Sequence, residues 1–328
     1  MAKFRVYITR NILGTGLDRL RTIADVMVHS DPKAPSPKEL LANVLDCEGL
    51  ITMLNDPITP EVMNAAGAKL RVISNYAVGF DNIDVDYATR KSIIVTNTPD
   101  VLTESTADLT WALLMAAARR LIEGDHVTRT GQWKEWTPNF LLGVDVHHKT
   151  LGIIGLGRIG LAVAKRALGF NMRVLYHNRT RRADLESQFH LEYRSLEDLL
   201  RESDFISLHV PKLPETIGLI GRDQLQLMKP SAILINAARG SIVDEPALVQ
   251  ALKESRIKAA ALDVYQQEPT RNRALFDLPN VVLSPHLGSA TLETRTRMAD
   301  LAVDNLIYGL TKQFDKMKIV NPSVLKQI

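Results

Sequence analysis

The chain has 328 residues, of which 45% are hydrophobic and 23% are charged, and this ordinary globular composition excludes a disordered chain. Its 40 basic and 37 acidic residues are dispersed and give a net charge of +3, so we expect no nucleic acid as a partner. A membrane-spanning helix takes about eighteen consecutive apolar residues, and neither such a run nor an apolar signal region is present. With Cys47 as the single cysteine, these features predict a cytoplasmic protein without a membrane partner.

Apolar segments typical of strands recur up to about residue 100, and helical patterns separate them. The strand segments are FRVYIT, DVMVHS, GLITML, KLRVISNYA and SIIVTNTP, and the helical patterns include GLDRLRTIA, SPKELLANVL and TPEVMNAAG. This alternation predicts a parallel sheet that is covered by helices on both faces.

A long apolar segment follows and predicts one helix over residues 104–131. It is more apolar than one face of a sheet requires, so we expect it to join two domains or to pack against another subunit. Trp133 and Trp136 come next in a loop, where packing or interface roles are more common than contact with a ligand.

A second α/β unit begins near Leu151 and contains six strand segments separated by helices, which is the rhythm of a doubly wound sheet. The strand segments are LGII, RVLYH, DFISLHV, AILINAA, AAALDVY and VVLSPH. After His286 comes a capped, periodic helix that we expect to cross back to the first unit. The sequence therefore predicts an α/β protein with two doubly wound parallel-sheet domains.

The segment GLGRIG stands between the first strand and the first helix of this second unit. Its Gly155, Gly157 and Gly160 have the spacing of a turn that approaches a pyrophosphate closely and lets the helix pack against its own strand. The N–H groups at the start of the helix would hold the phosphates. Glycine triplets also occur in ordinary turns, but the strand before and the helix after this one favour a dinucleotide site.

The loop after the second strand of this unit bears on which dinucleotide is bound. An NAD site places Asp or Glu there to bind the ribose hydroxyls, whereas this chain has Asn178, Arg179, Thr180, Arg181 and Arg182. A guanidinium group can bind a 2′-phosphate through charge-assisted hydrogen bonds. A solvated basic loop is the alternative interpretation, and the position of the arginines favours NADP (NADPH) as the cofactor, with NAD as a second one.

Three further strands of this unit end in polar residues. Ligands bind beyond the carboxyl ends of strands in open α/β sheets, so Arg239, Asp263 with the nearby Glu268, and His286 are candidates for a site. Each alone has an ordinary structural explanation, and their coincidence in one nucleotide domain favours a catalytic role.

These side chains suit hydride transfer to a 2-oxo acid. Arg239 would bind the substrate carboxylate and polarise the adjacent carbonyl group. Protonated His286 would deliver a proton to the carbonyl oxygen as hydride arrives at carbon. Glu268 would favour the charged imidazole and fix its orientation.

The motifs GLGRIG, INAARG, LDVYQQEP and SPHLGSAT together resemble the D-isomer-specific 2-hydroxyacid dehydrogenase family over nearly the full chain, and within it the glyoxylate/hydroxypyruvate reductase branch. The resemblance implies a Rossmann coenzyme domain, residues 101–287, inserted in a flavodoxin-like substrate domain, residues 1–100 and 288–328. It also implies a homodimer, and it assigns Arg239, Glu268 and His286 as the catalytic set. The lysine of phosphite-oxidising relatives is replaced here by Val78.

The resemblance assigns further residues to binding. The backbone around Val78 and Gly79 would bind the substrate carboxylate, Leu54 would line the same pocket, and Trp136 would reach the pocket of the neighbouring subunit. No metal ion is expected. Together with the glycine turn and the arginine-rich loop, the positions expected to contact the cofactor are Thr106, Gly155, Gly157, Arg158, Ile159, Gly160, Asn178, Arg179, Thr180, Arg182, Val210, Pro211, Thr216, Ala237, Asp263 and Gly288.

We therefore expect an NADPH-preferring reductase of small 2-oxo acids, with glyoxylate and hydroxypyruvate as substrates. Reduction of 2-ketogluconate is an alternative. A non-enzymatic dinucleotide sensor of the same fold is the competing class, and it would bind the cofactor tightly with negligible turnover.

Overall fold

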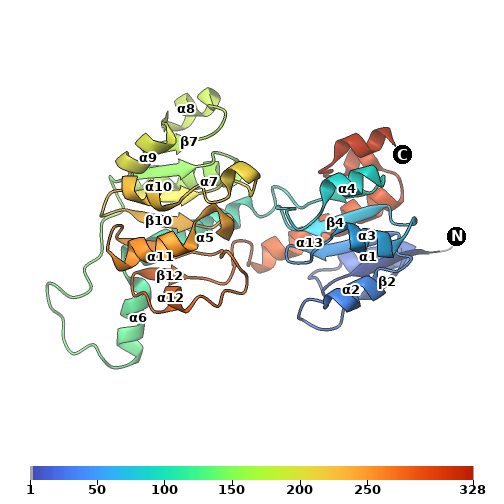
Figure 1. The fold of residues 1–328 in the computed structure, drawn as a ribbon, viewed down its shortest axis with the longest axis horizontal. Helices are drawn as coiled ribbons and strands as arrows, with labels where there is room; N and C mark the ends of the chain where they lie inside the picture. Colours follow the sequence, from blue (N-terminus) through green and yellow to red (C-terminus); the bar gives the residue numbers. More distant parts are fainter. Residues whose placement is uncertain (1–2, 328) are drawn as a thin grey trace. The chain divides into compact units, whose positions relative to one another are not determined.

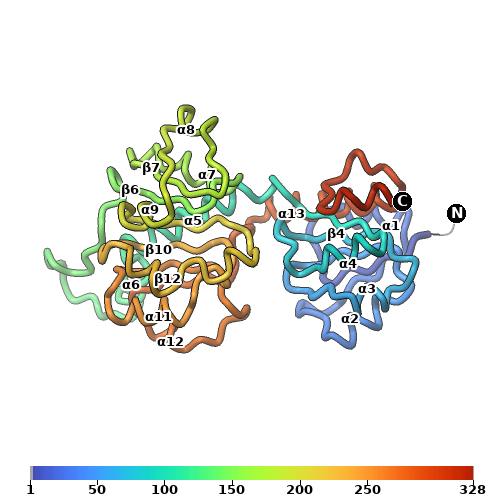
Figure 2. Tube along the Cα trace, turned by 45° about the horizontal axis from the view of Figure 1, so that its top comes forward, coloured from blue at the N-terminus to red at the C-terminus, as the bar shows by residue number. Residues whose placement is uncertain are grey.

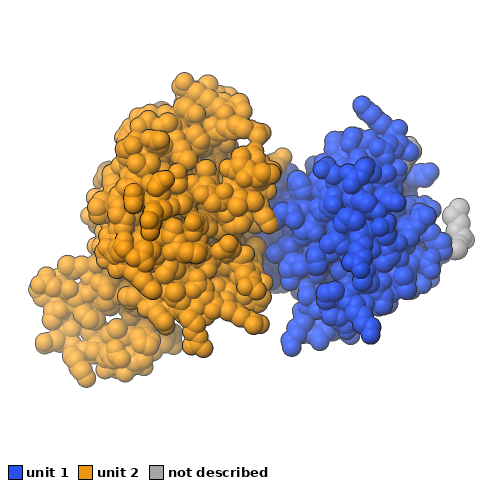
Figure 3. All heavy atoms as spheres, in the orientation of Figure 1, with its two compact units in different colours: residues 1–102, 289–328 blue, residues 103–288 orange. Residues whose placement is uncertain are grey.

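The computed structural model describes residues 3–327 of the chain. Two compact α/β units make up the molecule (Figures 1 and 3). Unit 1, blue in Figure 3, consists of Met1–Leu102 and Ser289–Ile328, and unit 2, orange, consists of Thr103–Gly288. Within the described residues no helix is long and apolar enough to cross a membrane.

Unit 1 contains one parallel sheet of five strands in the order β2-β1-β3-β4-β5. The strands carry apolar side chains on both faces, and separate hydrophobic clusters cover the two faces. The strands are β1 (Phe4–Ile8), β2 (Ala24–Val28), β3 (Gly49–Met53), β4 (Val72–Tyr76) and β5 (Ile94–Thr96). The helices of this unit are α1 (Gly16–Ile23), α2 (Pro37–Asn43), α3 (Pro60–Ala66), α4 (Val85–Arg90) and α13 (Leu292–Leu310).

The C-terminal helix α13 belongs to unit 1, as its pattern predicts. Thr291 caps it by accepting a hydrogen bond from the N–H of Thr294 at 3.1 Å. The helix packs against β3 and β4 and buries Met298, Val303 and Leu306 in the core. Figure 2 shows this last part of the chain beside the N-terminal elements of the same unit.

Unit 2 contains a parallel sheet of seven strands in the order β12-β11-β10-β9-β6-β7-β8. The predicted α/β fold with two parallel sheets is confirmed. The strands are β6 (Thr150–Ile154), β7 (Arg173–His177), β8 (Leu191–Tyr193), β9 (Phe205–Leu208), β10 (Ile233–Asn236), β11 (Ala259–Leu262) and β12 (Val281–Leu283). The helices after β6 are α7 (Arg158–Ala167), α8 (Ala183–Phe189), α9 (Leu196–Glu202), α10 (Arg222–Leu227), α11 (Glu245–Lys253) and α12 (Arg273–Phe276).

Strand β8 is absent from the six strands that the sequence predicts for this unit. It has only three residues, and its middle residue Glu192 carries a charge. The Glu192 carboxylate pairs with Arg173 on β7 at 2.8 Å. A cross-strand ion pair therefore takes the place of the apolar side chains from which a strand is usually predicted. Short 3-10 helices also occur, at Leu168–Phe170, Pro214–Thr216, Gly240–Ile242, Phe314–Lys316 and Pro322–Lys326.

The prediction of one helix over residues 104–131 is wrong, because the structure has two helices there. Helix α5 (Thr103–Ala118) packs against β10, β11 and α7, whereas α6 (Leu121–Arg129) buries none of its residues. The chain breaks at Arg120, which adopts a left-handed conformation with φ 52° and binds Glu123 through its guanidinium group at 2.9 Å. The N–H of Val144 donates to the carbonyl oxygen of Ala118 at 2.9 Å and closes the end of α5.

Residues 130–145 form an extended loop after α6 that stands away from the sheet of unit 2 (Figure 1). Trp133 and Trp136 lie on this loop and are 54% and 78% exposed. Within the described chain, neither indole is therefore buried in the core of unit 2.

Candidate active site

The three glycines of GLGRIG differ in what surrounds their Cα atoms. Gly155 follows β6 with φ 98°, and a Cβ atom there would lie 2.7 Å from the backbone of His209. At Gly160 a Cβ atom would lie 2.1 Å from the carbonyl oxygen of Gly155, so helix α7 packs tightly on the turn. At Gly157 nothing lies within 4 Å of the added atom. The packing of the chain therefore requires the first and third glycines, and the second leaves open space at the start of α7.

The arginine-rich loop after β7 carries three ion-paired arginines, of which Arg179 is the most exposed. The Arg179 side chain is 86% exposed and has Glu215 at 3.4 Å. Arg182 makes two bonds to the Asp184 carboxylate, at 3.0 and 2.7 Å. The Asn178 amide donates to the carbonyl oxygen of Thr180 at 2.9 Å and shapes the turn between them.

Two residues that the sequence analysis did not single out brace this loop. The Tyr176 hydroxyl accepts the N–H of Arg182 at 2.8 Å and donates to Glu186 at 2.6 Å. Glu186 in turn binds Arg181 through two bonds of 2.7 Å. The bonds from Arg181 and Tyr176 lower the pKa of Glu186 to about 2. Arg181 is thus a structural partner, and no sequence spacing distinguishes it from its neighbours.

The loops after β10, β11 and β12 place the three candidate catalytic side chains. His286 Nδ1 lies 2.7 Å from Glu268 Oε2, and the other carboxylate oxygen accepts the N–H of Tyr265 at 3.1 Å. Burial raises the pKa of Glu268, but the hydrogen bond to His286, the His286 charge and Arg239 outweigh it, so the net shift is downward. Both paired side chains keep more than a quarter of their surface exposed, which leaves them accessible to a ligand.

Arg239 is positioned by a close backbone approach. A Cβ atom at Gly240 would lie 1.8 Å from the carbonyl carbon of Tyr265, so only glycine lets the loop after β10 lie against the loop after β11. The Asn236 side chain, 1% exposed, donates to the carbonyl oxygen of Arg239 at 2.9 Å. Because these two loops are in contact, the positive charge of Arg239 helps to lower the pKa of Glu268.

Asp263 holds the backbone that carries His286. His286 has φ 55°, a conformation that side chains other than glycine rarely adopt. Its N–H donates to the carbonyl oxygen of Asp263 at 2.9 Å, and the Asp263 carboxylate accepts the N–H groups of Leu287 at 2.7 Å and Gly288 at 2.9 Å. The carboxylate is 1% exposed. Asp263 is predicted from the sequence as a cofactor contact, whereas this bracing role depends on backbone partners that only the fold brings near.

The other predicted cofactor contacts lie near the same edge of the unit 2 sheet. The Thr106 hydroxyl donates to the carbonyl oxygen of Gly288 at 3.1 Å and ties α5 to the His286 loop. The Thr216 hydroxyl donates to the carbonyl oxygen of Pro211 at 2.7 Å and so shapes the loop after β9. Ala237 directly follows β10, and Val210 lies two residues beyond β9.

In unit 1, asparagine side chains hold the loop that is predicted to bind the substrate carboxylate. Asn97 donates to the carbonyl oxygen of Val78 and Asn75 to that of Gly79, each at 2.8 Å. Within residues 3–327 the N–H groups of Val78 and Gly79 donate to no acceptor. A loop whose carbonyl groups are occupied and whose N–H groups are available suits an anion.

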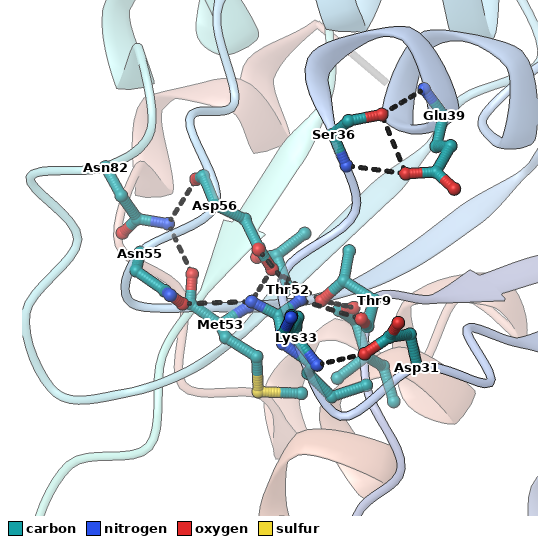
Figure 4. A network of polar contacts seen from close by, with 12 residues as sticks. Thr9, Asp31, Lys33, Ser36, Glu39, Thr52, Met53, Asn55, Asp56 and Asn82 are labelled. Atoms are coloured by element: carbon teal, nitrogen blue, oxygen red, sulfur yellow. Dashed lines mark hydrogen bonds and ion pairs between the residues drawn. The ribbon is translucent and has the colours of Figure 1, made fainter. Parts of the chain in front are cut away.

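A polar network joins this loop to the one that carries Leu54 (Figure 4). Asn82 donates to the carbonyl oxygens of Met53 and Asp56, each at 3.0 Å. The buried Asp56 carboxylate accepts the N–H of Met53 at 2.7 Å and forms an ion pair with Arg10 at 3.1 Å. Leu54 itself is 40% exposed.

A doubly wound sheet with a glycine turn after its first strand, and with Arg239, Glu268 and His286 at the ends of three others, defines an NAD(P)-dependent dehydrogenase. The profile of the family described as "D-isomer specific 2-hydroxyacid dehydrogenase, NAD binding domain" matches residues 111–288. The chain belongs to the D-isomer specific 2-hydroxyacid dehydrogenase family.

Similar proteins agree with this placement. A glyoxylate reductase of Thermococcus kodakarensis is 53% identical over 92% of each chain, and one of Pyrococcus horikoshii is 52% identical over 93% of this chain and 92% of its own. The crystal structure of an NADPH-dependent glyoxylate/hydroxypyruvate reductase from Sinorhizobium meliloti, in complex with NADP and malonate, has a TM-score of 0.82 at 34% identity over 94% of each chain. D-lactate dehydrogenase from Aquifex aeolicus, complexed with NAD and lactic acid, has a TM-score of 0.84 at 28% identity over 96% of this chain and 98% of that one.

Proposed function

We propose that the protein is an NADPH-preferring reductase that converts glyoxylate to glycolate and hydroxypyruvate to D-glycerate. The observation that carries the proposal is the 2.7 Å pair of His286 and Glu268 beside the loop of Arg239. A carboxylate-binding guanidinium group and an imidazole proton donor are the two groups that reduction of a 2-oxo acid requires from the protein. The glyoxylate reductases at about half identity support the same substrate class.

We assign Arg239 to the carboxylate end of the 2-oxo acid substrate. Its planar guanidinium group matches the geometry of a carboxylate and would also polarise the neighbouring carbonyl oxygen. The N–H groups of Val78 and Gly79 in unit 1 are proposed as further donors to the carboxylate, and Leu54 as an apolar contact beside them. Bound NADPH would supply the hydride.

His286 is assigned as the proton donor. Glu268 occupies its Nδ1 atom, so the proton that reaches the carbonyl oxygen comes from Nε2. The lowered pKa of Glu268 keeps the carboxylate ionised at neutral pH, 2.7 Å from the Nδ1 atom of His286. In the oxidative direction the neutral imidazole would accept the hydroxyl proton at the same atom.

The preference for NADPH is assigned to the arginine-rich loop. Arg179 is exposed, Arg182 of the same loop pairs with Asp184, and no acidic residue stands at the end of β7 to repel a 2′-phosphate. Gly157 leaves the space that a pyrophosphate needs at the start of α7. The Sinorhizobium enzyme, which is NADPH-dependent, supports this preference, and NAD is proposed as the weaker cofactor.

A homodimer is proposed from the surface of α6 and the loop after it. Six large apolar side chains on these segments are between 44% and 78% exposed, which is more than a monomer surface usually carries in one place. We assign a second copy of the chain as the cover, with Trp136 directed towards the partner's site. The apolar side chains are Leu121, Ile122, Trp133, Trp136, Phe140 and Leu142.

The test is a panel of 2-oxo acids with NADPH and NADH, followed by absorbance of the reduced nicotinamide. We expect the highest kcat/KM with glyoxylate or hydroxypyruvate and NADPH. Tight NADPH binding with no oxidation by any small 2-oxo acid would overturn the proposal and favour a dinucleotide sensor. A panel in which only 2-ketogluconate is reduced would replace the substrate assignment.

A further inference from the structure

The segment that carries Glu268 is bound at both of its ends by one carboxylate outside the three candidate catalytic residues. The segment, residues 266–272, belongs to the loop between β11 and α12. One oxygen of Glu245 accepts the N–H of Gln266 at 3.1 Å, and the other accepts the side-chain amide of Asn272 at 2.7 Å. We call these two hydrogen bonds the Glu245 bridge. Because of the bridge, both ends of the segment bind the same side chain.

Glu245 itself lies on a well-fixed element. It is the first residue of α11, and Asp244 caps this helix by accepting the N–H of Ala247 at 3.1 Å. The start of a helix favours a negative charge, so the Glu245 carboxylate is well placed there. The connection from β10 to α11 carries Arg239 as well as Glu245. The bridge therefore ties the loop of Arg239 to the segment of Glu268.

Asn272 has a defined hydrogen-bond direction in the bridge. Its Oδ1 atom accepts the N–H of Ala274 at 3.1 Å and caps α12, which leaves the side-chain amide N–H for Glu245. A carboxylate is an acceptor only, so the contact requires a donor at position 272 as long as Glu245 is ionised. Aspartate at position 272 would still cap α12, but it would face Glu245 with a like charge.

The bridge determines where the Glu268 carboxylate lies. Glu268 accepts the N–H of Tyr265 at 3.1 Å and has its other oxygen 2.7 Å from His286 Nδ1. The Tyr265 hydroxyl donates to the carbonyl oxygen of Ser284 at 2.9 Å, which anchors the chain just before the segment. Hydrogen bonds weaken beyond about 3.2 Å, so a displacement of about 0.5 Å at Glu268 is enough to weaken its pair with His286.

We propose that Glu245 is a positioning residue for the reaction. It acts through Glu268, because the Glu245 bridge holds residues 266–272 where the Glu268 carboxylate meets His286. The inference rests on the proposed function, since it uses the roles assigned there to Glu268 and His286. It adds a second effect, because the same bridge fixes this pair relative to the loop of Arg239.

The test exchanges the two partners of the bridge. Asn272→Asp brings two carboxylates together, whereas the double variant Glu245→Gln/Asn272→Asp restores one donor and one acceptor at the net charge of wild type. We expect kcat for glyoxylate to fall about tenfold in Asn272→Asp and to return to within about threefold of wild type in the double variant, with the dissociation constant of NADPH unchanged. No recovery in the double variant would overturn the inference.

The matched control is Glu254→Gln. It removes a carboxylate at the other end of α11, where Glu254 accepts the side-chain amide of Gln250. The change of charge is the same as in Glu245→Gln, but it lies outside the bridge. This variant should keep the rate of wild type, and a loss equal to that of Asn272→Asp would argue that any charge change near α11 lowers the rate.

A Glu268→Gln background distinguishes positioning from general support of the fold. If Glu245 acts through Glu268, Asn272→Asp should move the alkaline limb of the kcat pH profile in wild type and should lower kcat less than about threefold in Glu268→Gln. Tenfold losses in both backgrounds, with equal losses of unfolding free energy in urea, would overturn the inference alone. A Glu268→Gln variant with the rate of wild type would contradict the proposed function and this inference with it.

Discussion

Two sets of loops on the same edge of unit 2 are built in opposite ways. The loops that carry Arg239 and His286 are held by hydrogen bonds with the side chains of Asn236 and Asp263, and both of these residues are 1% exposed. The arginine-rich loop after β7 is held by the Tyr176 hydroxyl and by ion pairs at the surface, and its Arg179 side chain is 86% exposed.

The difference follows from what each loop is proposed to do. Proton transfer requires heavy atoms within about 0.5 Å of a productive arrangement, and buried hydrogen bonds provide that precision. Selection of a phosphate requires mainly positive charge, which exposed arginines provide at low cost but which salt screens. Changes in the first set should therefore affect the rate with either cofactor, and changes in the second should affect only the preference between cofactors.

The largest effect is expected for His286→Ala. Without its proton donor, reduction of glyoxylate should fall by about two to four powers of ten in kcat, while the dissociation constants of both cofactors stay near wild type. Stopped-flow rates and cofactor titration by fluorescence measure the two quantities. A rate within threefold of wild type would remove His286 from the mechanism.

A smaller effect, with a pH signature, is expected for Glu268→Gln. The pKa of Glu268 lies below its ordinary value of 4.5, so in wild type an ionised carboxylate stands 2.7 Å from His286 Nδ1 throughout neutral pH. Glutamine keeps a hydrogen bond but not the charge, so kcat should fall about a hundredfold and the alkaline limb of its pH profile should move to lower pH. An unshifted profile would mean that Glu268 only positions the ring.

The pair of Glu268 and His286 should also stabilise the folded protein, and the sign of the pH dependence follows from the lowered pKa of Glu268. A carboxyl group with a lowered folded-state pKa contributes stability above its unfolded value and loses it as the pH falls through the folded value. The difference in unfolding free energy between wild type and Glu268→Gln, measured by urea denaturation, should therefore shrink below about pH 4.5. A constant difference from pH 7 to pH 3 would argue against the ion pair.

The cofactor loop is tested by Arg179→Ala. NADPH binding should weaken by about 1.5 to 3 kcal/mol, the usual contribution of a hydrogen bond to a charged group, with NADH binding barely changed. Arg201→Ala is the matched control, because Arg201 is an exposed arginine paired with Glu197 at 3.2 Å on α9. Equal losses for NADPH and NADH would contradict a phosphate-binding role.

The smallest effect is expected for Tyr176→Phe, which keeps the buried ring and removes the hydroxyl that accepts the N–H of Arg182. The ratio of kcat/KM for NADPH to that for NADH should fall about two- to tenfold, because a neutral hydrogen bond contributes about 0.5 to 1.5 kcal/mol. The rate with NADH should stay constant. A fall in both rates would show that the hydroxyl supports the whole unit rather than the loop.

Features that depend on local pattern could be predicted from the sequence. Alternating apolar segments gave both sheets, and glycine spacing with strand-end polar residues gave the candidate site. The break at Arg120 could not be predicted, because the sequence on both sides is helical and only packing separates the buried α5 from the exposed α6. The bracing roles of Tyr176 and Asp263 depend on partners that the fold brings near, as does the contact between Glu245 and Asn272.

In the proposed reaction a hydride passes from the nicotinamide to the carbonyl carbon of glyoxylate. The direct measurement uses NADPH deuterated at both C4 positions, with mass spectrometry of the glycolate that forms and with His286→Ala alongside. We predict one deuterium in each glycolate molecule and one glycolate for each NADPH consumed, at a rate that falls by orders of magnitude in the variant. NADPH oxidation without deuterated glycolate would contradict the account.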